Sequence, residues 1–96
     1  MSQSLNEIEI LRQKIEILHQ DFFKIICDRQ DLVCQIWDLK KKSNLAMIDH
    51  QREELLIHQF DESTVLKNDE NFKEMYHNIV KNIMTETKKY LSQQPK

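Results

Sequence analysis

The first half of the chain carries one long apolar stripe. Its members recur at alternating steps of three and four positions, the spacing of a helix face that packs against another helix. They are Ile8, Leu11, Ile15, Leu18, Phe22, Ile25, Arg29, Leu32, Ile36 and Leu39, and Arg29 is the one polar residue among them. The stripe predicts a first helix over about 5–42, roughly 55 Å long at about 1.5 Å per residue. Because one chain of this size cannot cover such a stripe, we expect a second copy to cover it.

Two further helices are predicted after a break at Ser43 and Asn44. Asp49 is a suitable N-cap for a second helix over about 49–62. Apolar residues then recur at helical spacing in a third helix over about 69–91.

Asn68 or Asp69 can cap this third helix, and its apolar stripe includes a second polar residue, Thr87. We therefore predict an all-α fold with three helices per chain, the first of them very long. The three helices form a single domain over 1–96.

Composition supports this class and excludes several others. The 96 residues include no glycine and one proline, so the chain has almost no turn residues and β-hairpins are close to excluded. Fourteen basic and 16 acidic side chains are interspersed, which predicts no nucleic-acid partner and no anionic membrane surface. No stretch approaches membrane-spanning length and no apolar leader begins the chain, so we expect a soluble, cytoplasmic protein.

The sequence offers no metal or cofactor signal. Cys27 and Cys34 are seven positions apart, two helical turns, which is too far for a disulfide. The histidines show no close ligand spacing to the cysteines or to one another. They are His19, His50, His58 and His77. We expect a protein without metal or cofactor.

The sequence pattern predicts no counter-charge for Arg29 at the neighbouring positions of its own helix. The residues three and four positions away are all apolar: Ile25, Ile26, Leu32 and Val33. An unpaired buried charge costs several kcal/mol. The anion must come either from another helix or from a ligand, and the pattern leaves both alternatives open.

Two other cations lie on the same predicted helix as Arg29. Lys40 follows after eleven residues, close to three turns, so both side chains project from one face about 16 Å apart and can lean toward a small dianion. Arg12 precedes Arg29 by seventeen residues, or about 25 Å. In an antiparallel dimer Arg12 could instead reach the site of the partner chain.

The segment "DHQREELL" adds Asp49, Arg52 and Glu53 at the start of the second helix. Asp49 can accept hydrogen bonds there, and Glu53 stands one turn later on the same side. The pattern D-x-x-R-E is also common on solvated helix starts, so on its own it is weak.

Taken together, these positions resemble the all-helical AroQ class of chorismate mutases. The matching residues lie in "LRQKIEIL", "CDRQDLV", "DLKKK" and "DHQREELL", and the resemblance covers about residues 5–91. It implies an intertwined homodimer with two identical sites, each of which borrows the first-helix arginine of the other subunit. It also implies a dicarboxylate substrate, chorismate, and the shikimate pathway to aromatic amino acids.

The resemblance assigns roles to the cations. Arg29 and Arg12 of the partner subunit look like the clamps on the two carboxylates. Lys40 resembles the residue that contacts a carboxylate and the ether oxygen of the enolpyruvyl group.

The same resemblance assigns the ring-hydroxyl contacts to the second helix. Asp49 and Glu53 look like the groups that hold the hydroxyl, with Arg52 as a supporting residue.

The chain departs from the family pattern at three positions. Thr87 stands where the family usually has Gln or Glu against the ether oxygen, and Ile83 replaces a polar contact to a carboxylate. Trp37 occupies a position that is often Gly or Ala. A 4-amino-4-deoxychorismate mutase and an isochorismate pyruvate lyase are therefore alternatives on the same fold, and a non-catalytic helical dimerisation module is an alternative of another class.

Overall fold

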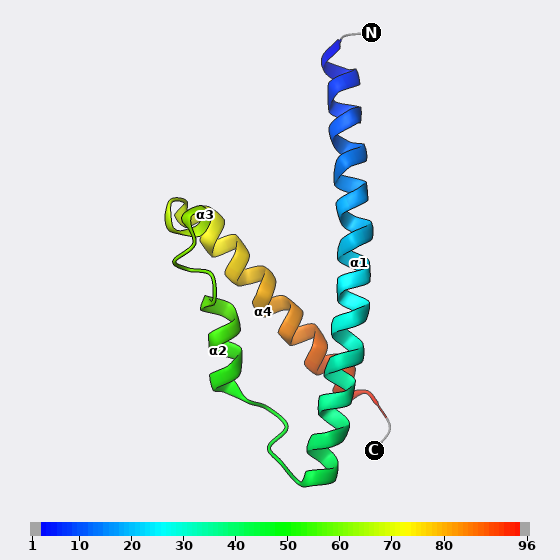
Figure 1. Ribbon diagram of the computed structural model, residues 1–96, viewed down its shortest axis with the longest axis vertical. Coiled ribbons are helices and arrows are strands. Elements are labelled where there is room, and N and C mark those ends of the chain that lie inside the picture. Colours follow the sequence, from blue (N-terminus) through cyan, green and yellow to red (C-terminus); the bar gives the residue numbers. More distant parts are fainter. Residues whose placement is uncertain (1–2, 95–96) are drawn as a thin grey trace. The chain divides into compact units, whose positions relative to one another are not determined.

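The computed structural model describes residues 3–94, and every regular element in that range is a helix (Figure 1). The predicted all-α class is confirmed. The helices are α1 (Gln3–Ser43), α2 (His50–His58), α3 (Thr64–Lys67) and α4 (Glu70–Ser92). The chain divides into two compact units, Met1–Leu39 and Lys40–Lys96. Across the described range, no helix combines the length and the apolarity needed to cross a bilayer.

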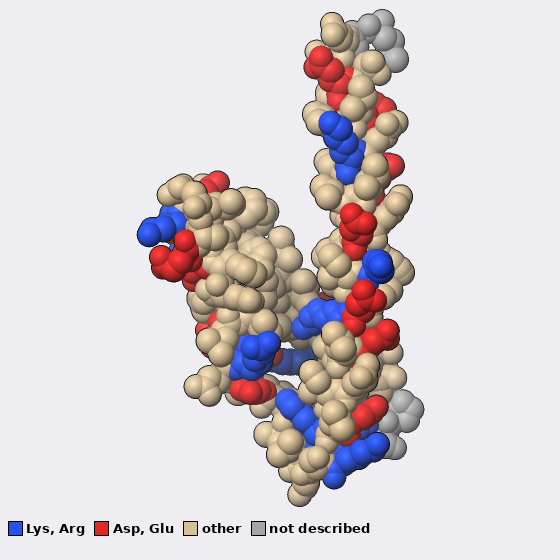
Figure 2. All heavy atoms as spheres, viewed as in Figure 1, with Lys and Arg blue, Asp and Glu red and all other residues tan. Residues whose placement is uncertain are grey.

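The first unit consists of most of α1. This helix has 41 residues, so it is about 60 Å long. Within the described residues it contains no buried side chain, and the apolar members of its stripe are exposed by 42% to 65%. Acidic and basic side chains alternate with uncharged areas along its surface (Figure 2). An exposed apolar stripe of this length is typical of a helix face that packs against another helix.

α1 ends at an asparagine in the left-handed conformation. Asn44 has φ 57°, and the Leu45 N–H donates to the Lys40 carbonyl at 2.9 Å. Helices commonly end in this way at a glycine. Since this chain has no glycine, asparagine takes the position, because its short polar side chain tolerates positive φ.

Side-chain caps define the starts of the other helices. Asp49 Oδ1 accepts from the Arg52 N–H at 3.0 Å, which confirms Asp49 as the N-cap of α2. Asp69 Oδ1 accepts from the Phe72 N–H at 3.0 Å in the same way, and α4 begins there. Each cap satisfies one of the backbone donors that a helix start leaves without a partner.

The segment between α2 and α4 differs from the prediction. The second helix was expected to run to about residue 62, but α2 ends at His58, and the short α3 makes four helices instead of three. The Asp61 and Ser63 N–H groups form turns with the carbonyls three residues before them. Ser63 Oγ then caps α3 by accepting from the Leu66 N–H at 3.4 Å. A local cap therefore starts a new helix where the apolar pattern alone gave no boundary.

The core of the second unit lies where α2 and α3 pack against α4. The four buried apolar side chains of the described range are Ile57, Leu66, Met84 and Leu91, all in this unit. The rings of Phe60 and Tyr76 meet edge to face at 6.2 Å and join the connection after α2 to α4. This core is small, so polar contacts between α2 and α4 contribute to how these helices are held together.

Candidate active site

The two arginines predicted to clamp carboxylates lie on α1 in the first unit. Arg12 and Arg29 are seventeen residues apart on one continuous helix, which separates them by about 25 Å along its axis. They cannot both grip the same small ligand from one chain. A site that uses both must take one of them from a second chain.

Lys40 lies in the last turn of α1, at the start of the second unit. Its Nζ donates to the Met47 carbonyl at 3.4 Å, so the side chain contacts the loop that leads to α2. An ammonium group has three donors, and this bond uses one of them.

Glu53 in the first turn of α2 forms an ion pair with a residue that the sequence did not indicate. Lys88 Nζ on α4 donates to Glu53 Oε1 at 3.0 Å and lies 2.7 Å from Oε2. The Glu53 side chain is 20% exposed and that of Lys88 43% exposed. His50 Nδ1 lies 3.5 Å from Glu53 Oε1 as well. Arg52, beside Glu53, is exposed.

Lys88 was missed because no spacing rule connects it to Glu53. The two residues are 35 positions apart, and only the packing of α2 on α4 brings them together. The pair holds the Glu53 carboxylate in one orientation at the start of α2.

Thr87 and Ile83, the predicted contacts on the last helix, are both half-buried on α4. Thr87 Oγ1 donates to the Ile83 carbonyl at 2.7 Å. Threonine in a helix often makes this bond to the carbonyl four residues earlier. The hydroxyl hydrogen therefore points to the backbone, and the hydroxyl can donate to a ligand only when this bond breaks.

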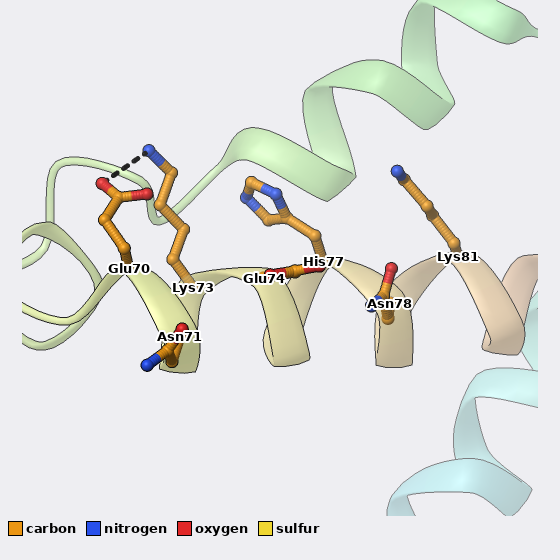
Figure 3. Close-up of a pocket in the computed structure, with 7 residues that line it drawn as sticks. All are labelled: Glu70, Asn71, Lys73, Glu74, His77, Asn78 and Lys81. Carbon is orange, nitrogen blue, oxygen red and sulfur yellow. Dashed lines mark ion pairs between the residues drawn. The ribbon is translucent and has the colours of Figure 1, made fainter.

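A depression of about 390 Å³ lies along α4. Its charged lining residues are Glu70, Lys73, Glu74 and Lys81, with His77 between them, and Lys73, His77 and Lys81 project to one side of the helix (Figure 3). The site residues predicted from the sequence are not among those that line it in the described part of the chain.

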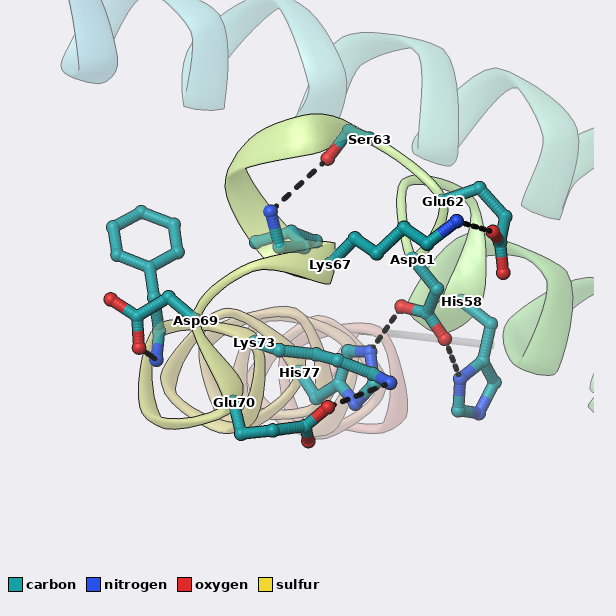
Figure 4. A network of polar contacts seen from close by, with 11 residues as sticks. His58, Asp61, Glu62, Ser63, Lys67, Asp69, Glu70, Lys73 and His77 are labelled. Atoms are coloured by element: carbon teal, nitrogen blue, oxygen red, sulfur yellow. Dashed lines mark hydrogen bonds and ion pairs between the residues drawn. The ribbon is translucent and has the colours of Figure 1, made fainter.

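A second polar cluster joins the end of α2 to α4. Asp61 lies between two histidines: His77 Nε2 is 2.6 Å from Oδ1, and His58 Nδ1 is 2.9 Å from Oδ2 (Figure 4). The imidazole rings meet edge to face with their centroids 4.7 Å apart. The hydrogen bond from His77 lowers the pKa of the Asp61 carboxyl, partial burial opposes this shift, and His58 adds to it.

This cluster was not foreseen, because spacing along the chain gave no metal signal among the histidines. His58 and Asp61 are three residues apart around a helix end, and His77 arrives from another helix. Each of the three side chains offers one ligand atom, and these three atoms lie within 4.8 Å of one another, so the side chains could hold a metal ion.

Comparison with known proteins identifies the family. Residues 11–91 match the family model of chorismate mutase type II, and this range includes every candidate site residue from Arg12 to Thr87. No curated protein and no solved structure matches the chain. The family model covers most of the chain and agrees with the all-helical structure that begins with a long helix. The chain therefore belongs to the chorismate mutase type II family.

Proposed function

We propose that this protein is a chorismate mutase that rearranges chorismate to prephenate. The observation that carries the proposal is the family match over residues 11–91. The reaction is a unimolecular pericyclic rearrangement, so the protein needs no nucleophile, no metal and no proton shuttle. It has to hold the reactive diaxial conformer and stabilise the negative charge that grows on the ether oxygen as the C–O bond breaks.

In this proposal the carboxylate clamps come from two chains. Arg29 and Arg12 of the partner subunit hold the substrate's two carboxylates, because the rigid guanidinium fork binds a planar carboxylate bidentately. Lys40 contacts a carboxylate and the ether oxygen. Two observations support an intertwined homodimer: the distance of about 25 Å between the two arginines on one helix, and the exposed apolar stripe of α1.

The start of α2 is proposed to bind the substrate ring. Asp49 and Glu53 accept from the ring hydroxyl, and Arg52 supports them. Lys88 holds the Glu53 carboxylate at 2.7 Å and places a positive charge beside it. A neutral hydroxyl can donate to Glu53 next to this charge, whereas the ammonium group of 4-amino-4-deoxychorismate would be repelled by it. The pair thus favours chorismate over its 4-amino relative.

On the side opposite Lys40, we propose that the ether oxygen receives only a weak hydrogen bond. Thr87 is shorter than the Gln or Glu usual in the family, and its hydroxyl already donates to the Ile83 carbonyl. Ile83 itself has no polar side-chain group to offer a carboxylate. We therefore assign most of the charge stabilisation to Lys40 and expect a lower rate than in family members with both donors.

The test is a direct assay of chorismate, isochorismate and 4-amino-4-deoxychorismate with product identification by chromatography. We expect prephenate from chorismate. Replacing Arg29 or Lys40 by alanine should lower kcat/KM at least about 100-fold, because a fixed cation of this kind contributes about 3 kcal/mol. Circular dichroism and the oligomeric state should remain unchanged.

Lys42→Ala is the matched control, since Lys42 is an exposed lysine in the same last turn of α1. It should keep wild-type activity. Full activity in Arg29→Ala or Lys40→Ala would refute the mechanism. Absence of both turnover and saturable dicarboxylate binding in the wild type would favour a non-catalytic dimerisation module.

A further inference from the structure

We propose that His58, Asp61 and His77 form a binding site for Zn²⁺ that ties the end of α2 to α4. The cluster lies outside the residues assigned to chorismate. It combines two imidazoles and one carboxylate, and this ligand set suits Zn²⁺ and not the harder Mg²⁺.

The distances are compatible with a common metal ion. The two histidine nitrogens lie 2.6 Å and 2.9 Å from the Asp61 oxygens, and the three ligand atoms all lie within 4.8 Å of one another. Zn²⁺ binds nitrogen and oxygen at about 2.0 to 2.2 Å, so tetrahedral ligands stand roughly 3.3 Å apart. Small rotations of side chains can bring the three atoms to that spacing, and water would complete the four ligands.

His58 lies between two carboxylates. Nδ1 faces Asp61 Oδ2 at 2.9 Å, and Nε2 faces Glu54 Oε2 at 3.3 Å. A neutral imidazole has one N–H, so it can donate to only one of these carboxylates. The other nitrogen then directs a lone pair at a carboxylate oxygen, which is repulsive unless a proton or a metal ion lies between them.

A metal ion resolves this arrangement in the usual manner of histidine ligands. When Nε2–H donates to Glu54, the lone pair on Nδ1 is directed at the site that Asp61 shares. A carboxylate that accepts from the outer nitrogen of a metal-binding histidine fixes its tautomer and orientation and strengthens the ligand. Glu54 occupies that position here.

His77 completes the set from α4. Its side chain is 14% exposed, against 51% for His58, so one ligand is held firmly in the packed part of the unit. His77 also lines the depression along α4, which gives an ion a path from solvent. Because these ligands come from separate elements, they assemble only in the folded chain, and bound Zn²⁺ should stabilise that state.

The experiment is calorimetric titration of the metal-free full-length protein with ZnCl₂ and, in parallel, with MgCl₂. Thermal unfolding is followed with each metal. We expect one Zn²⁺ per chain, a higher Tm with Zn²⁺, and no comparable effect of Mg²⁺. His77→Ala and Asp61→Asn should each lower the affinity for Zn²⁺ by more than about 100-fold. Glu54→Ala should lower it by about 10- to 100-fold, as expected for an outer partner.

Two controls separate the cluster from other ligands. His19→Ala removes a histidine of α1, and the double variant Cys27→Ser/Cys34→Ser removes both thiols; Zn²⁺ binding should survive in each. If His77→Ala does not fold, Asp61→Asn and the more exposed His58→Ala provide the same test. Absence of Zn²⁺ binding, unchanged binding in the cluster variants, or loss of binding in the cysteine variant would overturn the proposal.

Discussion

Replacing Leu18 by aspartate tests whether the apolar stripe of α1 is an interface between two chains. Leu18 is the most exposed member of the stripe, at 65%. In an isolated chain a carboxylate at this position would stay in water and cost little. In the proposed dimer it would be forced into the contact between two helices.

The expected magnitude follows from the exposure. Full burial of a leucine side chain contributes about 1.5 to 3 kcal/mol, so covering the exposed two-thirds of Leu18 contributes about 1 to 2 kcal/mol per chain. Both chains of the dimer lose this burial energy in the variant, a total of about 2 to 4 kcal/mol. The desolvation of two carboxylates weakens the dimer further. Since about 1.4 kcal/mol changes an equilibrium constant tenfold, dimer affinity should fall roughly a thousandfold or more.

The measurement is molar mass by light scattering after size-exclusion chromatography over a range of protein concentrations. Wild type should have the mass of a dimer and Leu18→Asp that of a monomer, with lower helicity. Gln20→Asp, which introduces the same charge two residues further on and off the stripe, should remain dimeric. A monomeric wild type, or a Leu18→Asp variant that dimerises like wild type, would contradict the proposed interface and with it the shared site.

Substitutions at three further positions test individual groups. Thr87→Gln should raise kcat for chorismate severalfold, because the longer amide can donate to the ether oxygen instead of to the Ile83 carbonyl. An unchanged kcat would mean that this position of α4 does not contact the ether oxygen. Lys88→Met removes the charge that repels the substrate ammonium, so it should raise the ratio of kcat/KM for 4-amino-4-deoxychorismate to kcat/KM for chorismate. An unchanged ratio would show that Lys88 does not determine substrate specificity. Asn44→Ala should lower the free energy of unfolding in urea by about 1 kcal/mol, because alanine is disfavoured at φ 57°. Asn44→Gly should lower it less, and equal losses in both variants would contradict the backbone argument.

The elements predicted well are those with a strong local cause. The apolar stripe of α1 repeats over ten positions, so the helix assignment does not depend on any one residue. Asp49 acts as the predicted cap, as does Asp69, because a capping oxygen reaches an N–H only three residues ahead.

The expected end of α2 near residue 62 differs from its end at His58 in the structure, because this boundary depends on competition between neighbouring caps. Ser63 starts a new helix four residues long, and its Leu66 is 3% exposed. A sequence pattern shows that a serine can cap and that a leucine can be buried. It does not show that both take place in so short a segment.

The contacts between helices in the candidate site could not be predicted from the sequence either. The spacing of Arg29 and Lys40 follows from the geometry of one helix and could be predicted. The ion pair of Glu53 with Lys88 spans 35 positions, and no periodicity links two helices across a variable connection. His77 is hidden from sequence reasoning for the same reason.

The distances between the two polar contacts that join α2 to α4 determine how one contact can affect the other. Glu53 contacts Lys88 at the start of α2, and His58 approaches His77 at its end. Glu53 and His58 are about 7 Å apart along the axis of α2. Lys88 and His77 are about 16 Å apart along the axis of α4. A metal ion at the histidines could therefore affect Glu53 only by restricting the backbone of α2, not by direct contact. If it does so, thermodynamic reciprocity requires chorismate to change the affinity for Zn²⁺ by the same factor by which Zn²⁺ changes the affinity for chorismate.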